Sequence, residues 1–208
     1  KDDLSSASPL TNLSKLENGD FLTNGGRVLG ATETADTLED AIAAAQDGDT
    51  ITLLADIEAS EVILIGKSIT INGNGHKVTS SATRVFRVTT GNVQVTMNDL
   101  NIVSTAVRAP GVDSIRGISI DGGFTGIELT LNDCSVDFTD ATATDYSYAV
   151  NIVSGTGHTV TINGGSYEAA NVINLWGNDH QIDVDGAVLT SIYGINEMYH
   201  GGIVRVEG

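Results

Sequence analysis

Three aspartates are the residues of this chain that could supply acid–base chemistry. Asp121 directly follows a segment in which apolar and polar residues alternate, and Asp113 and Asp145 lie in two long polar stretches. Two carboxyl groups on either side of a glycosidic bond can hydrolyse it, one as the acid and the other as base or nucleophile. Acids in loops are more often solvated surface groups, so a catalytic pair drawn from these three residues is the lesser alternative.

A second set of residues could bind a ligand without transforming it. Several short segments alternate polar residues with Ile, Val, Leu or Phe, which turns the polar side chains away from the core if the segments are strands. Amide and guanidinium groups beside flat aromatic rings suit sugars. The predicted substrate-binding residues are therefore Arg87, Ser119, Asn151, Asn174, Arg205, Trp176, Tyr146 and Tyr199. Taken singly, each is explained at least as well as a polar residue on an outer face or an aromatic that covers the core.

The spacing of ligand-type residues predicts no metal site and no cofactor. The four histidines lack the short spacings of zinc ligands. The segment Asp183-Val184-Asp185-Gly186 follows the pattern of an EF-hand loop, but Ile192 stands where that loop needs its bidentate Glu. A loosely held Ca²⁺ is the alternative to a solvated acidic face, with the ligands Asp137, Asp140 and Asp145.

Charge and composition exclude several classes of partner. The 208 residues carry 10 basic and 27 acidic side chains, a formal net charge of 10 − 27 = −17. Such a surface repels phosphate backbones and anionic lipid headgroups, so nucleic acid and membrane surfaces are poor partners. The single cysteine, Cys134, excludes an internal disulfide framework. With 40% hydrophobic residues, the chain is long and apolar enough for one globular domain.

The elements that must position these side chains recur along the chain. Between the repeated segments described next lie apolar–polar–apolar segments at 86–88, 118–120, 150–152, 173–175 and 204–206. Shorter apolar segments surround Val78, Ile102, Val136, Tyr167 and Val188. The clearest repeat is an alternating triplet followed by Asn or Asp and then by Gly or Asp: Ile69-Thr70-Ile71-Asn72-Gly73, Val95-Thr96-Met97-Asn98-Asp99, Leu129-Thr130-Leu131-Asn132-Asp133, Val160-Thr161-Ile162-Asn163-Gly164 and Ile182-Asp183-Val184-Asp185-Gly186.

Three short strands in the same order in each repeat predict an all-β solenoid. One repeat cannot close a core, but repeats stacked at about 4.8 Å bury their inward residues against those above and below. We therefore predict a single-stranded parallel β-helix of about six coils. A β-sandwich is the alternative, but it does not predict a recurring three-strand order with Asn at one corner.

One helix is predicted at 37–46, where it would cover the first coil. Thr37 is its expected N-cap, and Leu38, Ile42 and Ala45 form one apolar stripe. Together with the strand start Gly48-Asp49-Thr50-Ile51, this helix resembles the opening of the right-handed parallel β-helix superfamily typified by pectate and pectin lyases. The resemblance covers about residues 37–208. It implies a right-handed β-helix in which Asn72, Asn98, Asn132 and Asn163 stack as an internal ladder.

The resemblance also implies where a ligand would bind. In that superfamily the sheet equivalent to 85–88, 117–121, 149–153, 172–176 and 203–206 lines a substrate groove, and the long loops beside it would be about 105–116, 139–147 and 192–202. Tyr148 and Tyr193 belong to the same region. The catalytic motifs of the enzymes in the superfamily are absent, and His200-Gly201-Gly202 is the nearest approach to one.

The two ends of the sequence are less informative. We predict that residues 1–36 are a partly ordered N-terminal arm and that residues 37–208 form the β-helix domain. The N-terminus has no apolar segment of a signal peptide, and no capping segment follows the last strand before Gly208. An uncapped coil exposes a strand edge, so we expect an oligomer or a neighbouring domain there.

The sequence thus favours a non-catalytic β-helix module, secreted or at a cell surface, that binds a poly- or oligosaccharide as an adhesin does. A polysaccharide lyase or glycoside hydrolase with an unfamiliar site is the first alternative. A structural or assembly element is the second.

Overall fold

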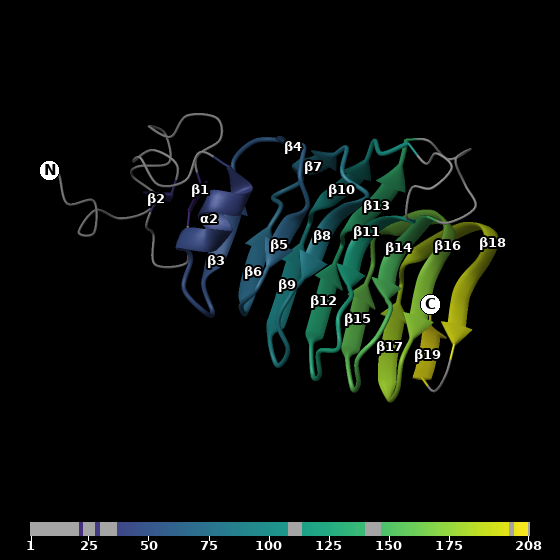
Figure 1. Ribbon diagram of the computed structural model, residues 1–208. Helices are drawn as coiled ribbons and strands as arrows, with labels where there is room; N and C mark the ends of the chain where they lie inside the picture. The colour runs from purple at the N-terminus through teal and green to yellow at the C-terminus, as the bar shows by residue number, and fades with distance from the viewer. Residues whose placement is uncertain are drawn as a thin grey trace, which may run out of the picture.

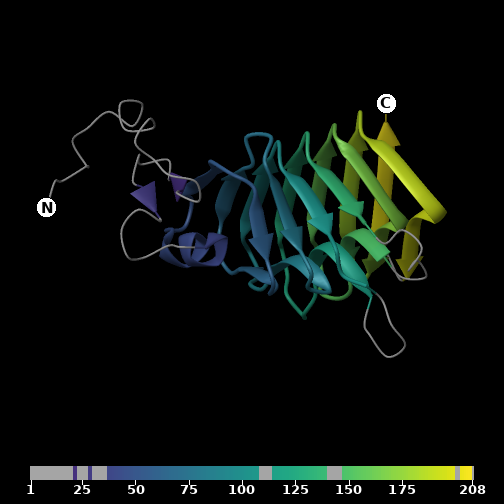
Figure 2. The same ribbon diagram turned by 90° about the horizontal axis from the view of Figure 1, so that it is seen from above.

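The computed structural model describes residues 21–22, 28–29, 37–107, 114–139, 147–199 and 202–207, of which 21–22, 28–29 and 196–199 are described by their backbone alone. Most of this chain is parallel β-structure in two long sheets that face each other across one core, in a solenoid-like arrangement (Figures 1 and 2). No helix in the described ranges is long and apolar enough to cross a membrane.

The first sheet has nine strands, and those from β3 to β19 run parallel to one another. Neighbouring strands come from successive passes of the chain, because each pass adds one strand. In spatial order the strands are β19 (Gly202–Glu207), β17 (His180–Asp185), β15 (Thr159–Asn163), β12 (Glu128–Asn132), β9 (Gln94–Asn98), β6 (Ile69–Asn72), β3 (Thr50–Leu53), β1 (Phe21–Leu22) and β2 (Val28–Leu29).

The second sheet contains the other strands of each coil. Two runs of strands meet in it because β16 pairs with β13 at its start and with β14 at its end. β18 (Val188–Tyr199) pairs with β16 along its length. The remaining order is β4 (Ile57–Ala59), β7 (Lys77–Ser80), β10 (Asn101–Ser104), β13 (Ser135–Phe138), β16 (Ser166–Trp176), β14 (Ser147–Ile152), β11 (Ile115–Ile120), β8 (Arg84–Val88) and β5 (Ile63–Ile65).

In-register stacking builds the core. The second apolar residue of each repeated triplet lies opposite its counterpart on the next strand. All five are at most 2% exposed, so each apolar side chain is shielded by the coils on both sides. They are Ile71, Met97, Leu131, Ile162 and Val184.

The predicted asparagine ladder is present at the corner that follows these triplets. The side-chain amide of Asn98 donates to Oδ1 of Asn72 at 2.7 Å, Asn132 donates to Asn98 at 2.7 Å, and Asn163 donates to Asn132 at 2.8 Å. The residues that follow Asn98, Asn132 and Asn163 have a left-handed backbone conformation, as in Asp99 at φ 47° and Asp133 at φ 50°. The ladder satisfies side-chain amides where the chain turns sharply, so these asparagines are structural.

The predicted helix is α2 (Leu38–Ala44). Thr37 is its N-cap, and its hydroxyl accepts a hydrogen bond from the backbone N–H of Asp40 at 3.1 Å. Leu38, Ala41 and Ile42 are buried in the core. At the other end of the helix, the Lys67 ammonium donates to the carbonyl of Ala45 at 2.7 Å, which ties the helix to the chain between β5 and β6.

Three details of the predicted strand pattern are wrong. The second and third strands of the last two coils are fused in β16 and β18, so 192–199 is strand and not loop. The residue opposite Tyr167 is Leu189, and Val188 is 63% exposed. The segment 203–206 belongs to β19, which pairs with β17 in the first sheet and not with the predicted groove sheet. The reason is that β18 already occupies the next place beside β16.

Two glycines on either side of β15, Gly157 and Gly165, both have a positive φ but differ in how closely they are packed. A Cβ at Gly165 (φ +82°) would lie 1.8 Å from the carbonyl oxygen of Cys134, whereas a Cβ at Gly157 (φ +65°) would meet nothing within 4 Å. Gly165→Ala should therefore lower the free energy of unfolding by about 3–5 kcal/mol, from strain plus overpacking. Gly157→Ala should cost about 1–2 kcal/mol, from strain alone. Urea denaturation of both variants tests this, and equal losses would contradict it.

Candidate functional site

The structure brings four of the predicted binding residues into one column. Arg87, Ser119, Asn151 and Asn174 lie directly opposite one another on β8, β11, β14 and β16, as the alternation predicted. The side-chain amide of Asn174 donates to Oδ1 of Asn151 at 2.8 Å, and that of Asn151 donates to Oγ of Ser119 at 3.1 Å. The column is therefore a second ladder across the coils.

Most of this second ladder is not open to a ligand. Ser119 and Asn151 are 0% exposed and Asn174 is 6% exposed, so both faces of the sheet are buried at these positions. Alternation predicted outward side chains but could not predict that the outer face is covered. The three residues hold neighbouring coils together, and only the Arg87 side chain, 41% exposed, reaches solvent.

Asp121, the described member of the predicted acidic pair, is held by arginines. One carboxylate oxygen accepts from Nε of Arg84 at 2.6 Å, and the other pairs with Nε of Arg87. A guanidinium nitrogen of Arg87 also donates to the Asp121 backbone carbonyl at 3.3 Å. The Asp121 side chain is only 12% exposed. Both oxygens are thus engaged in charge-assisted contacts that link β8 to the end of β11.

The other predicted residues lie apart from this column or outside the described chain. Asp113, Asp145, Asp140 and Tyr146 fall outside the described residues. Tyr199 lies opposite Trp176 in the backbone pairing of β18 with β16. Trp176, at the end of β16, is 38% exposed.

Arg205 does not belong to the predicted groove. It lies in the first sheet, opposite Asp183 in the register of β17 and β19, and its guanidinium pairs with that carboxylate at 3.2 Å. A hydrogen bond from Gln181 and the pairing with Arg205 hold the pKa of Asp183 below its usual value. Asp183 and Arg205 line a shallow hollow on the outer face of this sheet, together with Asn163, Asp185 and Glu207.

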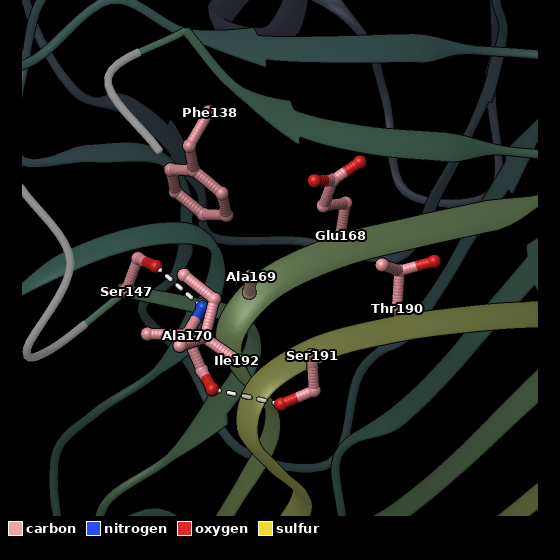
Figure 3. Close-up of a pocket in the computed structure, with 8 residues that line it drawn as sticks. All are labelled: Phe138, Ser147, Glu168, Ala169, Ala170, Thr190, Ser191 and Ile192. Carbon is pink, nitrogen blue, oxygen red and sulfur yellow. Dashed lines mark hydrogen bonds between the residues drawn. The ribbon is translucent and has the colours of Figure 1, made fainter. Parts of the chain in front are cut away.

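A small pocket lies at the corner where the second sheet bends (Figure 3). It offers about 60 Å³ to water and has an apolar floor of Phe138, Ala169, Ala170 and Ile192. The hydroxyls of Ser147 and Ser191 are bonded to the backbone of Ala170 at 2.8 Å each. Glu168 and Thr190, opposite each other on β16 and β18, are the exposed polar groups of its rim. This combination of apolar floor and polar rim is typical of small-ligand sites.

A β-bulge shapes this pocket. Between the pairs Ala169–Ser191 and Asn171–Gly194, β16 has one residue where β18 has two. Both residues of β18 at the bulge have exposed side chains: Ile192 is 58% exposed and Tyr193 is 60% exposed. Bulges re-aim side chains beside functional sites. The sequence predicts Tyr193 as an aromatic residue in a loop beside the groove, but nothing in the sequence pattern indicates the bulge.

The remaining candidates for chemistry among the described residues are the thiol of Cys134 and clusters of metal-ligating side chains. Cys134 is fully buried, and burial raises the pKa of its thiol to about 11, so it stays protonated at neutral pH. No group of three or more His, Cys, Asp or Glu side chains in the described part of the chain is arranged to hold a metal ion.

The two ladders differ in burial, so we expect substitutions of Asn151 and Asn163 to differ in their effect on the free energy of unfolding. Asn151→Ala leaves Ser119 and the Asn174 amide without their partner inside the protein, so the free energy of unfolding should fall by about 2–3 kcal/mol. Asn163→Ala removes the exposed end of the other ladder, and about 1 kcal/mol or less should be lost because water replaces the contact. Thermal denaturation of the two variants makes the comparison. A smaller loss for Asn151→Ala would show that its buried hydrogen bonds are not structural.

No family model matches the chain, and neither the curated proteins nor the solved structures compared with it include a match.

Proposed function

We propose that this chain is a non-catalytic, right-handed parallel β-helix module of a secreted or cell-surface protein, and that it binds a poly- or oligosaccharide. The parallel register from coil to coil, the asparagine ladder and the helix over the first coil support the β-helix. Right-handed crossovers are the rule for parallel strands in one sheet. The acidic charge and the resemblance to the pectate lyase-like superfamily support the extracellular location.

The bulge at Ile192–Tyr193 is the observation that carries the binding proposal. It exposes Ile192, which lines the corner pocket, and the aromatic ring of Tyr193, the next residue in the chain. Glu168 and Thr190 add a carboxylate and a hydroxyl to the rim of this pocket. A sugar needs both kinds of surface, because its ring faces are apolar and its hydroxyls require hydrogen-bond partners. Ser119, Asn151 and Asn174, which the sequence predicted to bind the ligand, are buried. We therefore assign sugar binding to the corner pocket, which is open to solvent.

A lyase or glycoside hydrolase is the competing function. It would need a free acid–base pair, whereas Asp121 has both carboxylate oxygens paired with arginines. The polar groups around it are thus arranged to hold strands together.

The binding proposal predicts the effect of removing the exposed aromatic ring. Tyr193→Ala should weaken the binding of a glycan identified on an array about tenfold, since a central aromatic contact contributes more than 1 kcal/mol. Leu64→Ala is the matched control: Leu64 is 52% exposed on β5 of the same sheet, several coils away, and binding should be unchanged. Isothermal titration measures both. An array on which no glycan binds would instead favour the structural or assembly role.

The same proposal predicts that polysaccharides are bound without being cleaved. Incubation with acidic and neutral polysaccharides should release neither unsaturated nor reducing ends. If ends are released, and if a folded Asp121→Ala variant no longer releases them, the protein is an enzyme and Asp121 belongs to its site.

A further inference from the structure

Two histidines are stacked inside the solenoid between its last coils. His158 and His180, the histidine pair, are 0% and 1% exposed. Their rings are parallel within 3° and their centroids lie 4.7 Å apart. His180 begins β17 and His158 directly precedes β15, so the pair occupies equivalent positions on successive coils.

The hydrogen bonds of the pair require neutral imidazoles. Nδ1 of His158 accepts from the backbone N–H of Ile127 at 3.1 Å, and Nδ1 of His180 accepts from the backbone N–H of His158 at 3.1 Å. A protonated ring carries a hydrogen on both nitrogens and cannot accept. Protonation would therefore set two donors against each other and place a positive charge in the interior of the protein.

Two glycines create the space for these rings. Gly155 and Gly177 each stand three residues before one of the histidines, with φ of +96° and +129°. A Cβ at Gly155 would lie 2.5 Å from Nε2 of His158, and a Cβ at Gly177 would lie 2.3 Å from Nε2 of His180. The backbone thus encloses both rings, and a charged ring has no room to turn toward water.

The ionisable surroundings of the pair offer little compensation for a charge. The residue next to His158 on the preceding coil is Ile127, and the residue opposite His180 on the following strand is Gly202. Neither of these two residues has an ionisable side chain. Burial, and then the other ring, lowers the pKa of His158 to about 4. Burial also lowers the pKa of His180, although the backbone of Trp176 and the charge of Asp179 act in the opposite direction. Among the described residues, Asp179 is the carboxylate that acts on the pair.

We propose that the histidine pair is an acid-sensitive latch: it holds the last coils together while both rings are neutral, and it releases β17 and β19 when a ring is protonated. Because the folded protein disfavours protonation, the full stability is present above the unfolded value near pH 6.5 and is lost as the pH falls toward 4. For His158 alone, the unfolding equilibrium constant should rise on the order of 100-fold between pH 7.5 and pH 4.

The test compares the wild-type chain with His158→Asn and His180→Asn from pH 7.5 to pH 4. Asparagine keeps an acceptor at the δ position but does not titrate, so each variant should lose much less stability on acidification than the wild type. His76→Asn is the control, because His76 is a partly exposed histidine paired with Asp56 at 3.4 Å, and its acid loss should equal that of the wild type. Identical acid losses in all four proteins would overturn the proposal.

A local measurement separates the latch from general acid unfolding. Amide hydrogen exchange, corrected for its intrinsic pH dependence, should show that β17 and β19 lose protection at pH 4.5 while β6 and β9 keep theirs. If the two asparagine variants do not fold, NMR titration of the wild-type imidazoles decides. Titration of both buried rings near pH 6.5 would overturn the latch, whereas titration well below that value supports it.

Discussion

The in-register stacking of parallel strands is the constraint on which the rest of this structure depends. No single coil has enough apolar surface to form a core, so each inward residue is buried only because its counterpart above and below is also apolar. The same register aligns every other position in columns. A side chain is therefore selected by its neighbours on two adjacent coils as much as by its own strand. This explains why Ile71, Met97 and Leu131, which lie in one column, are all apolar and buried.

Polar columns obey the same rule with hydrogen bonds in place of apolar contact. The corner asparagines and the column of Ser119, Asn151 and Asn174 both form ladders in which each amide donates toward the preceding coil. The histidine pair is a third case, in which the ring nitrogen of one coil accepts from the backbone of the coil before it. Each ladder stabilises the stack, and the polar groups that bond to one another within it are not offered to a ligand.

A binding site consequently needs a place where the column pattern is broken. The bulge in β18 is such a place, since it inserts one residue relative to β16 and turns Ile192 and Tyr193 away from the ladder. The rigid sheet on both sides fixes the positions of Glu168 and Thr190, so the rim of the pocket is preorganised. Function on this scaffold is thus expected at irregularities, because the regular positions are used for stacking.

The sequence alone determined the features that depend on neighbouring residues in the chain. The alternating triplets fixed which side chains are buried, the Asn-Gly and Asn-Asp pairs marked a corner, and Thr37 with its apolar stripe marked the helix. Only the tertiary structure decided which sheet the last strand joins, whether the outer face around Asn151 is covered, and where β18 bulges. These three features depend on the length of the preceding coil and on contacts with parts of the chain that are distant in sequence. Local periodicity carries neither kind of information, so the sequence could not predict that Arg205 joins the first sheet or that the amides of Asn151 and Asn174 are buried, whereas it could predict the core.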